Sequence, residues 1–233
     1  MKILITGICG FVGSSLAHIL SEDSTLDIHG VDDLSFGYKE RIEDIQNKVS
    51  FHEKDVHTFS SSTSTRFDII INAAAIAPLP DNQVDHSRSL AVNVGTLGSL
   101  IDFMTKTGCK RLLHFSSSAV YEGLRTKNLA GHTVGDKLEP HLMYPISKYL
   151  SEVYLKAQAE VYGLDVISLR LFNLYGPRQD YFRKQTPLLG YLIKNILQKK
   201  PVTLFASPEA KRDYIYILDL INFIKIVLNE PAS

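Results

Sequence analysis

The chain has 233 residues, of which 45% are hydrophobic and 21% charged, and its 25 Lys and Arg residues balance 25 Asp and Glu residues. Zero formal net charge and apolar runs no longer than a strand predict neither a nucleic-acid partner nor a membrane segment. The chain enters a strand without a signal-like segment. The distant Cys9 and Cys109 are typical of reduced core thiols, so we expect a cytoplasmic protein, with no metal site.

Apolar runs of strand length alternate with helical periodicity along the chain. The pattern predicts strands over residues 2–6, 28–32, 49–52, 68–73, 111–116 and 165–171, and helices from residue 11, over 87–107 and over 144–162. Residues 58–65, rich in Ser and Thr, are interpreted as a flexible linker. The alternation predicts an α/β fold, with a Rossmann-type doubly wound parallel sheet, helices on both faces and right-handed crossovers.

The first predicted strand runs into Gly7, Gly10 and Gly13, which form a G-x-x-G-x-x-G turn before a helix. Glycines here permit a tight turn and let the backbone approach a pyrophosphate, while the helix amino terminus offers free N–H groups and a positive dipole end. The turn therefore indicates a dinucleotide site, and a plain glycine-rich turn is the alternative.

The second predicted strand ends in Asp32 and Asp33. Carboxylates at this point suit the ribose hydroxyls of a dinucleotide and would repel a 2′-phosphate. The pattern favours NAD over NADP, with Lys39 and Arg41 nearby leaving NADP open.

A Ser-rich strand end at residues 116–118 is followed by Tyr144 and, four residues later, Lys148. On a helix this spacing puts the two side chains on one face, and we expect the charge of Lys148 to lower the phenol pKa from its usual value near ~10. A tuned phenol can take the proton of an alcohol while a hydride leaves the same carbon. Tyr and Lys at this spacing are also common on half-buried helix faces, so the pair carries weight only together with the glycine turn.

These motifs, in this order, resemble the extended short-chain dehydrogenase/reductase family, in its NAD-dependent nucleotide-sugar epimerase and dehydratase branch, which includes UDP-glucose 4-epimerases. Further segments that agree are Asp55-Val56, residues 73–75, residues 93–96, residues 170–178 and residues 212–219. The resemblance spans nearly the whole chain and is more specific for the family than for the substrate.

The resemblance implies NAD as the cofactor and a catalytic group of three residues. Ser117 would hydrogen-bond the reacting oxygen of the sugar, Tyr144 would be the base, and Lys148 would be its electrostatic partner and a ligand of the nicotinamide ribose. The residues implied to bind NAD are Gly7, Gly10, Phe11, Val12, Gly13, Asp32, Asp33, Asp55, Val56, Ala73, Ala74, Ala75, Asn93, Ser116, Tyr144, Lys148 and Phe172.

The residues implied to bind the substrate are Ser117, Ser118, Tyr144, Asn173 and Arg212. Asn173 resembles the residue that contacts the phosphates, and the Arg212 guanidinium suits a diphosphate because it grips oxygens in pairs. A turn-capping amide is the alternative for Asn173, and an ion pair with Asp213 or Asp219 is the alternative for Arg212.

The residues after Ser117 separate the reactions of this branch. Dehydratases place an Asp-Glu pair there for the extra proton transfers, whereas this chain has Ser118 and Ala119. The sequence therefore predicts a nucleotide-sugar 4-epimerase, with a UDP-hexose as substrate and a role in polysaccharide synthesis, working by transient oxidation at C4. A reductase or dehydratase of the same family, and a truncated, non-catalytic NAD-binding protein, are the alternatives.

Two departures from the family concern the carboxy-terminal lobe and residue 72. The sequence stops at Ser233, so we expect a short or truncated carboxy-terminal lobe, with an NAD-binding domain over residues 1–172 and a partial substrate lobe over 173–233. Asn72 stands where the family frequently has His.

A homodimer is also predicted, because the family usually pairs the helix of residues 90–104 with the helix after Tyr144 in a four-helix interface. The apolar residues available for it are Leu97, Leu100, Ile101, Leu150, Tyr154 and Leu155, and core packing explains some of them equally well.

Overall fold

The computed structural model describes residues 1–122, 131–181, 186–204 and 211–231. The chain forms two compact units, the first of which comprises Met1–Leu171 and Pro231, and the second Phe172–Glu230.

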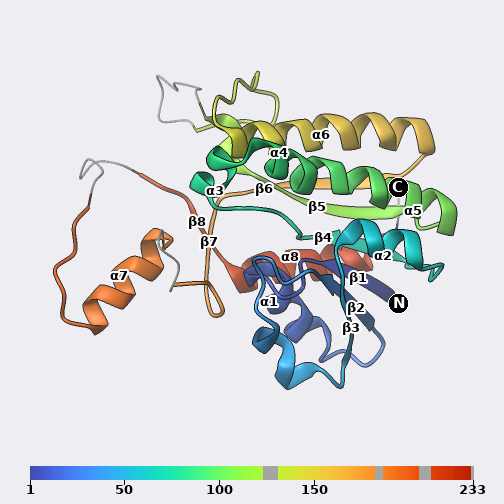
Figure 1. The fold of residues 1–233 in the computed structure, drawn as a ribbon, viewed down its shortest axis with the longest axis horizontal. Helices are drawn as coiled ribbons and strands as arrows, with labels where there is room; N and C mark the ends of the chain where they lie inside the picture. The colour runs from blue at the N-terminus through green and yellow to red at the C-terminus, as the bar shows by residue number, and fades with distance from the viewer. Residues whose placement is uncertain (123–130, 182–185, 205–210, 232–233) are drawn as a thin grey trace. The chain divides into compact units, whose positions relative to one another are not determined.

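The first unit is built on a six-stranded parallel sheet in the order β3-β2-β1-β4-β5-β6, as Figure 1 shows. The strands are β1 (Lys2–Thr6), β2 (Asp27–Asp32), β3 (Val49–Glu53), β4 (Ile69–Asn72), β5 (Arg111–Ser117) and β6 (Asp165–Leu171). Each predicted strand is present, with ends that differ by at most one residue from those expected. The order reverses between β1 and β4, and this is the point where doubly wound sheets bind ligands, at the carboxyl ends of their strands.

Helices cover both faces of this sheet, as predicted. The helical segments are α1 (Phe11–Leu20), η1 (Lys39–Ile45), α2 (Val56–Ser62), α3 (Leu79–Val84), α4 (His86–Leu90), η2 (Ala91–Gly95), α5 (Thr96–Thr107), η3 (Ser118–Tyr121) and α6 (Met143–Tyr162). In Figure 1, α5 and α6 run along one face of the sheet and α1 lies on the other. The helix expected over 87–107 is interrupted at η2 by one turn of π-helix, a feature that frequently marks functional sites.

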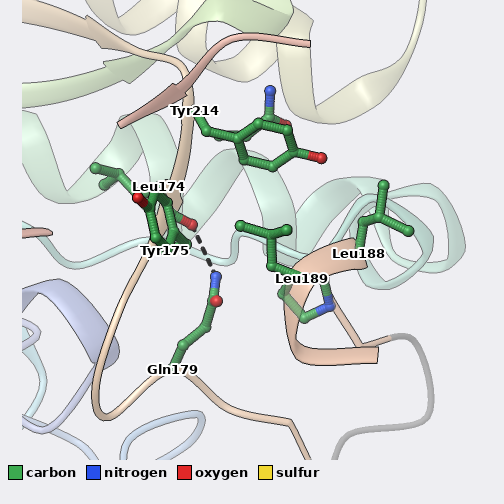
Figure 2. Close-up of a pocket in the computed structure, with 8 residues that line it drawn as sticks. Leu174, Tyr175, Gln179, Leu188, Leu189 and Tyr214 are labelled. Atoms are coloured by element: carbon green, nitrogen blue, oxygen red, sulfur yellow. Dashed lines mark hydrogen bonds between the residues drawn. The ribbon is translucent and has the colours of Figure 1, made fainter. Parts of the chain in front are cut away.

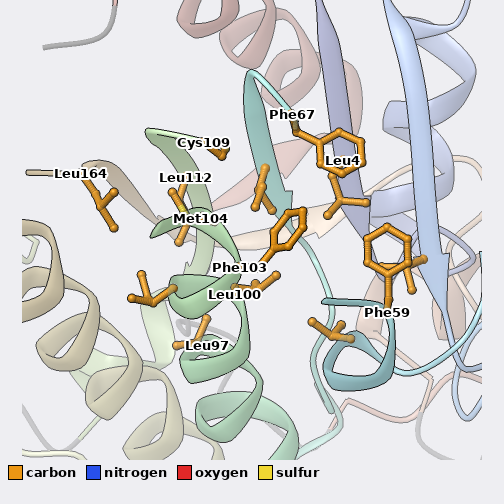
Figure 3. Close-up of a cluster of buried hydrophobic side chains, with 14 of the residues drawn as sticks. Leu4, Phe59, Phe67, Leu97, Leu100, Phe103, Met104, Cys109, Leu112 and Leu164 are labelled. Atoms are coloured by element: carbon orange, nitrogen blue, oxygen red, sulfur yellow. The ribbon is translucent and has the colours of Figure 1, made fainter. Parts of the chain in front are cut away.

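One hydrophobic core lies between the sheet and the helices α2, α5 and α6, and successive residues of β1 point alternately into it and to the other face of the sheet. Leu4 belongs to the cluster drawn in Figure 3, together with Phe67 and Phe103, whose ring centres lie 6.0 Å apart. Ile3 and Ile5, which point to the opposite face because strand side chains alternate, are equally buried. Strands buried on both faces are typical of parallel sheets.

Four of the residues considered for a dimer interface belong to this core instead. Leu97, Leu100, Ile101 and Leu155 are at most 2% exposed and lie in the same buried cluster. Their periodicity therefore reflects packing within the chain, whereas Leu150 is 41% exposed.

The prediction of a flexible linker over residues 58–65 is wrong for most of the segment, because residues 58–62 belong to α2. The carboxylate of Asp55 caps this helix by accepting a hydrogen bond from the Thr58 amide at 2.9 Å. The Ser60 hydroxyl donates back to the carbonyl of Val56, and Phe59 is buried in the core. The cap and the buried face outweigh the low helix propensity of a serine-rich segment.

The second unit contains a short parallel pair of strands and two helices. These are β7 (Asn173–Tyr175) and β8 (Tyr214–Tyr216), with α7 (Leu188–Leu197) and α8 (Ile217–Asn229). Gly176 follows β7 with a φ of 149°, and a Cβ there would meet the side chain of Ile217 at 2.4 Å, so only glycine fits this turn.

Among the residues described, no helix combines the length and apolar character needed to cross a membrane.

Candidate functional site

The glycine turn between β1 and α1 is closed by backbone contacts that exclude larger residues. Gly7 has a φ of 66°, and a Cβ there would lie 2.8 Å from the backbone of Ala74. A Cβ on Gly13 would lie 2.2 Å from the carbonyl oxygen of Gly7. Gly10 is the N-cap of α1 and has no side chain, so the amide groups of Phe11 and Val12 begin the helix without a side-chain cap. An uncapped helix end of this kind binds anions.

Asp32, at the end of β2, lies beside this turn, whereas Asp33 is exposed. The two carboxylate oxygens of Asp32 accept hydrogen bonds from the amides of Cys9 and Leu34, both at 2.9 Å. Burial raises the pKa of Asp32, and these two hydrogen bonds oppose that shift. Each oxygen keeps a further lone pair for another donor. The Asp33 carboxylate accepts from the amide and hydroxyl of Ser35.

The two cations that left NADP open already have protein partners. Lys39 forms a salt bridge of 3.2 Å with Glu53, and Arg41 donates to the carbonyl oxygen of Cys9 at 3.1 Å. These contacts match the preference for NAD drawn from Asp32.

The segment after β4 lies directly against the glycine turn. The amide of Ala73 donates to the carbonyl of Thr6, and the amide of Ala74 donates to the Thr6 hydroxyl, both at 3.2 Å. Ala75 follows them in the same segment. The small residues at 73–75 therefore stand at the switch point of the sheet, directly after β4.

Asn93 forms hydrogen bonds within the protein rather than presenting its side chain to a ligand. It is 1% exposed, its carbonyl accepts from the amide of Ile76 at 2.8 Å, and its amide donates to the Ser147 hydroxyl at 2.9 Å. Its side chain thus joins the segment after β4 to α6. Asp55 and Val56 also have structural contacts, since Asp55 caps α2 and Val56 is buried in the core.

The three residues predicted to be catalytic are brought together where β5 meets the start of α6. Ser117 is the last residue of β5, and its hydroxyl hydrogen-bonds the Tyr144 side chain. The ammonium of Lys148 lies 6.0 Å from the centre of the Tyr144 ring. Ser118, which follows Ser117, begins η3.

The expectation that Lys148 lowers the pKa of Tyr144 is not met in this structure. Burial raises the phenol pKa, and the hydrogen bond from Ser117 opposes that shift. Lys148 instead donates to the carbonyl of Phe115 at 2.7 Å. Burial lowers the pKa of Lys148 to about 8, with the Glu152 carboxylate opposing.

Sequence reasoning missed a partly buried ion pair beside these residues. Glu152 accepts three hydrogen bonds from Arg170, at 2.7, 3.0 and 3.1 Å, and one from the hydroxyl of Ser116. Arg170 also donates to the hydroxyl of Tyr121 at 2.9 Å. The signal was present, because Glu152 follows Lys148 by four residues and therefore shares its face of α6.

The remaining predicted residues belong to the second unit. Phe172 follows β6 directly and opens this unit. Asn173 is exposed and its amide donates to the carbonyl of Asp213 at 2.8 Å, so it joins the ends of β7 and β8. Arg212 is exposed and donates to the carbonyl of Lys211, and no salt bridge to Asp213 or Asp219 is found in the described part of the chain.

A hollow of about 240 Å³ lies within the second unit, and Figure 2 shows its lining. It is lined by Asn173, Leu174, Tyr175, Gln179, Pro187, Leu188, Leu189 and Tyr214. The Gln179 amide donates to the carbonyl of Leu174 at 2.9 Å, which fixes the turn after β7. Apolar and aromatic walls with a few polar groups are typical of small-molecule sites.

The model of the NAD dependent epimerase/dehydratase family matches residues 3–233. The chain belongs to this family. It is 28% identical to an uncharacterised UDP-glucose epimerase of Bacillus subtilis (strain 168), over 99% of this chain and 73% of that protein.

Solved structures of UDP-glucose 4-epimerases resemble the family member described here. The Thermotoga maritima enzyme, solved with UDP-glucose, has a TM-score of 0.90 and 27% identity, over 99% of this chain and 74% of that one. The Thermus thermophilus enzyme, solved with NAD, has a TM-score of 0.82 and 27% identity, over 100% of this chain and 76% of that one.

NAD, the cofactor of the family, fits the residues at the switch point. The helix end at Gly10 offers amide groups without a side chain in front of them, and Asp32 retains acceptor capacity beside it. Within the described ranges, no cluster of His, Cys, Asp and Glu could hold a metal ion.

Proposed function

We propose that this chain is an NAD-dependent nucleotide-sugar 4-epimerase that acts on a UDP-hexose. The observation that carries the proposal is the convergence of Ser117, Tyr144 and Lys148 beside the switch point of the sheet. Ser118 and Ala119 support epimerisation over dehydration, because neither side chain can supply the acid and base that elimination needs.

In the proposed site, the helix end at residues 10–13 would hold the pyrophosphate of NAD, and Asp32 would hold the adenosine ribose. When bound, NAD supplies a carbon that accepts the hydride from C4 of the sugar and returns it to the other face of that carbon. Lys148 would bind the nicotinamide ribose, since one ammonium has three donor protons.

Tyr144 would carry the proton of the C4 hydroxyl. Its phenolate would take this proton when the alcohol is oxidised to a ketone, and the resulting phenol would give it back when the ketone is reduced, so the side chain ends each cycle as the phenolate it began as. The Ser117 hydroxyl and the Lys148 ammonium would stabilise this phenolate before the proton arrives, offsetting the burial that raises the phenol pKa.

The second unit would bind the nucleotide part of the substrate. The hollow at Tyr175, Leu189 and Tyr214 would take the base, and Asn173 and Arg212 would contact the diphosphate. These assignments rest on the lining of the hollow and on the resemblance of Asn173 and Arg212 to residues of the family.

A cytoplasmic homodimer that works in polysaccharide synthesis completes the proposal. On α6, Leu150 and Val153 are 41% and 50% exposed and could face a second copy. A mass of one chain in light scattering would contradict the dimer.

The enzymatic proposal is tested by incubating the purified chain with NAD and each of several UDP-hexoses, and following interconversion by proton NMR. Tyr144→Phe should abolish interconversion and leave NAD affinity, measured by calorimetry, nearly unchanged. Tyr162→Phe on the same helix is the matched control, because Tyr162 is exposed and should retain full activity. Tight NAD binding without turnover of any UDP-hexose would identify a non-catalytic NAD-binding protein instead.

A further inference from the structure

A continuous chain of buried hydrogen bonds crosses the sheet and ends on the carbonyl oxygen of Lys148. It begins at Thr6, which donates to the Asn72 carbonyl at 2.5 Å. The Asn72 amide lies 3.1 Å from Nδ1 of His114, and Nε2 of His114 lies 2.9 Å from the hydroxyl of Ser151. The chain therefore links β1, β4, β5 and α6.

The direction of each hydrogen bond in this chain is determined by its neighbours. The Ser151 hydroxyl donates to the carbonyl of Lys148 at 2.7 Å, so its proton is already used. The Asn72 carbonyl accepts from Thr6, so the group that faces His114 is the Asn72 amide, which can only donate. His114 must accept at Nδ1 and donate from Nε2, and this is the neutral Nε2–H tautomer.

Every member of this chain is buried. Thr6, Asn72, His114, Ser151 and Lys148 are at most 3% exposed. A protonated His114 would bring an Nδ1–H against the Asn72 amide, two donors facing each other, and its charge would be repelled by that of Lys148. Burial and the charge of Lys148 lower the pKa of His114 well below its ordinary value, in agreement with the neutral tautomer.

We propose that His114 is a positioning residue for the proposed epimerase, which holds α6 at the depth where the Lys148 ammonium reaches the carbonyl of Phe115 and Tyr144 reaches Ser117. His114 lies on β5, directly before Phe115. Phe115 binds the ammonium of Lys148, and His114 binds the Ser151 hydroxyl that donates to the carbonyl of Lys148. The same strand therefore contacts both ends of this residue. The hydroxyl of Thr6 also accepts from the Ala74 amide, so the chain connects the segment at the switch point with the helix that carries the proton chemistry. The inference rests on the proposed function for its kinetic consequences alone.

The tautomer is tested without any assay of activity. In the 15N-labelled protein, His114 is assigned by comparison with His114→Phe. Its long-range proton–nitrogen correlations should show neutral Nε2–H at pH 7 and still at pH 5.5, below the ordinary value of about 6.5. Asn72→Asp replaces the facing amide by a carboxylate and should put a proton on Nδ1. An Nδ1–H tautomer, or a charged ring at pH 7, in the unchanged protein would overturn the proposal.

The positioning role is tested by Ser151→Ala against a matched control, Ser60→Ala. Both serines are buried and donate to a carbonyl of their own helix, at 2.7 Å each, but Ser60 lies in α2 and has no place in the chain. Ser151→Ala should lower kcat at least about tenfold, since small displacements of catalytic groups are costly, and leave KM within about twofold. It should also shift the NMR signal of the Lys148 side chain, whereas Ser60→Ala should change neither.

Two outcomes separate this proposal from the proposed function. If no UDP-hexose is turned over by the unchanged protein, the epimerase is lost, while the Lys148 signal still reports on positioning. If Ser151→Ala and Ser60→Ala leave the Lys148 signal equally unmoved, the chain of hydrogen bonds only stabilises the core, and the positioning role is overturned.

Discussion

The Lys148 ammonium donates a hydrogen bond of 2.7 Å to the carbonyl oxygen of Phe115, so the cation on α6 is fixed to the backbone of β5. The contact removes Lys148 from bulk solvent, and burial lowers its pKa to about 8. Its charged form is therefore the larger fraction at pH 7 and the smaller fraction at pH 9.

This shift predicts the pH dependence of the proposed reaction. In the proposed mechanism the reactive form carries a Tyr144 phenolate and a Lys148 ammonium. Because the pKa of Tyr144 is raised and that of Lys148 is about 8, kcat/KM should rise about tenfold per pH unit below pH 8 and level off above it. Lys148→Arg, which stays charged, should remove this levelling, so that kcat/KM continues to rise. A profile in which kcat/KM rises steadily from pH 7 to 9.5 would contradict the assignment.

Glu152 should influence both stability and the charge of Lys148. Glu152→Gln leaves the partly buried Arg170 without its anion and should cost about 3 kcal/mol of unfolding free energy. Because the Glu152 carboxylate raises the pKa of Lys148, the variant should also move the levelling of kcat/KM to lower pH. Urea unfolding and the pH profile measure the two effects.

Asp165→Asn is the matched control for Glu152→Gln. Asp165 forms a similarly buried pair with Arg111, at 2.5 Å, and this pair lies at the opposite end of β5 and β6. The variant should lose comparable stability but leave the pH profile unchanged. A shift of the profile in both variants would mean that destabilisation, rather than charge, moves it.

The glycine turn predicts a graded response to alanine. A Cβ on Gly13 would lie 2.2 Å from the Gly7 carbonyl, whereas a Cβ on Gly10 would lie 3.1 Å from the same atom. Gly13→Ala should therefore lower NAD affinity at least about a hundredfold, and Gly10→Ala distinctly less. The Gly7 carbonyl would have to move by about an ångström to admit the first methyl group, and by only a few tenths of an ångström to admit the second. Calorimetric titration with NAD measures the difference, and equal losses would contradict it.

The buried His114 and the half-buried His52 predict that stability falls in mild acid. Burial lowers the pKa of His114 and of His52, which stacks on His29. Below about pH 6.5 the unfolded chain binds protons that the folded chain does not, so the free energy of unfolding decreases as the pH falls. The urea midpoint should be lower at pH 5.5 than at pH 7.5, and His52→Phe should reduce this difference. An unchanged midpoint would contradict the shifts.

The sequence was sufficient for the sheet because strands buried on both faces, as β1, β4 and β5 are, appear in it as continuous apolar runs of strand length. It failed at α2, where a single capping contact from Asp55 and the burial of Phe59 outweighed a composition typical of a loop. It also failed at η2, because a single π turn of five residues is too short for its pattern to be distinguished from that of the α-helices around it.

For the site, the sequence predicted which residues lie together but not the direction in which the pKa of Tyr144 is shifted. Tyr144 and Lys148 are together as the spacing required, yet the pKa of Tyr144 is raised rather than lowered, because burial is a property of the folded surroundings. The hydrogen bonds among Asn72, His114 and Ser151 join three separate elements, so spacing along the chain could not predict them.

Asn93 shows that a residue of a family motif can form hydrogen bonds between two segments of the chain as well as contact a ligand. Its amide and carbonyl are bonded to Ser147 and Ile76, so this residue determines the separation between the segment after β4 and the base of α6. Loss of activity on replacing Asn93 would therefore report a change in spacing between two halves of the site. Residues that a motif marks as ligand-binding therefore fall into two kinds: those that contact the ligand, and those that fix the distance between the elements carrying the contacting residues.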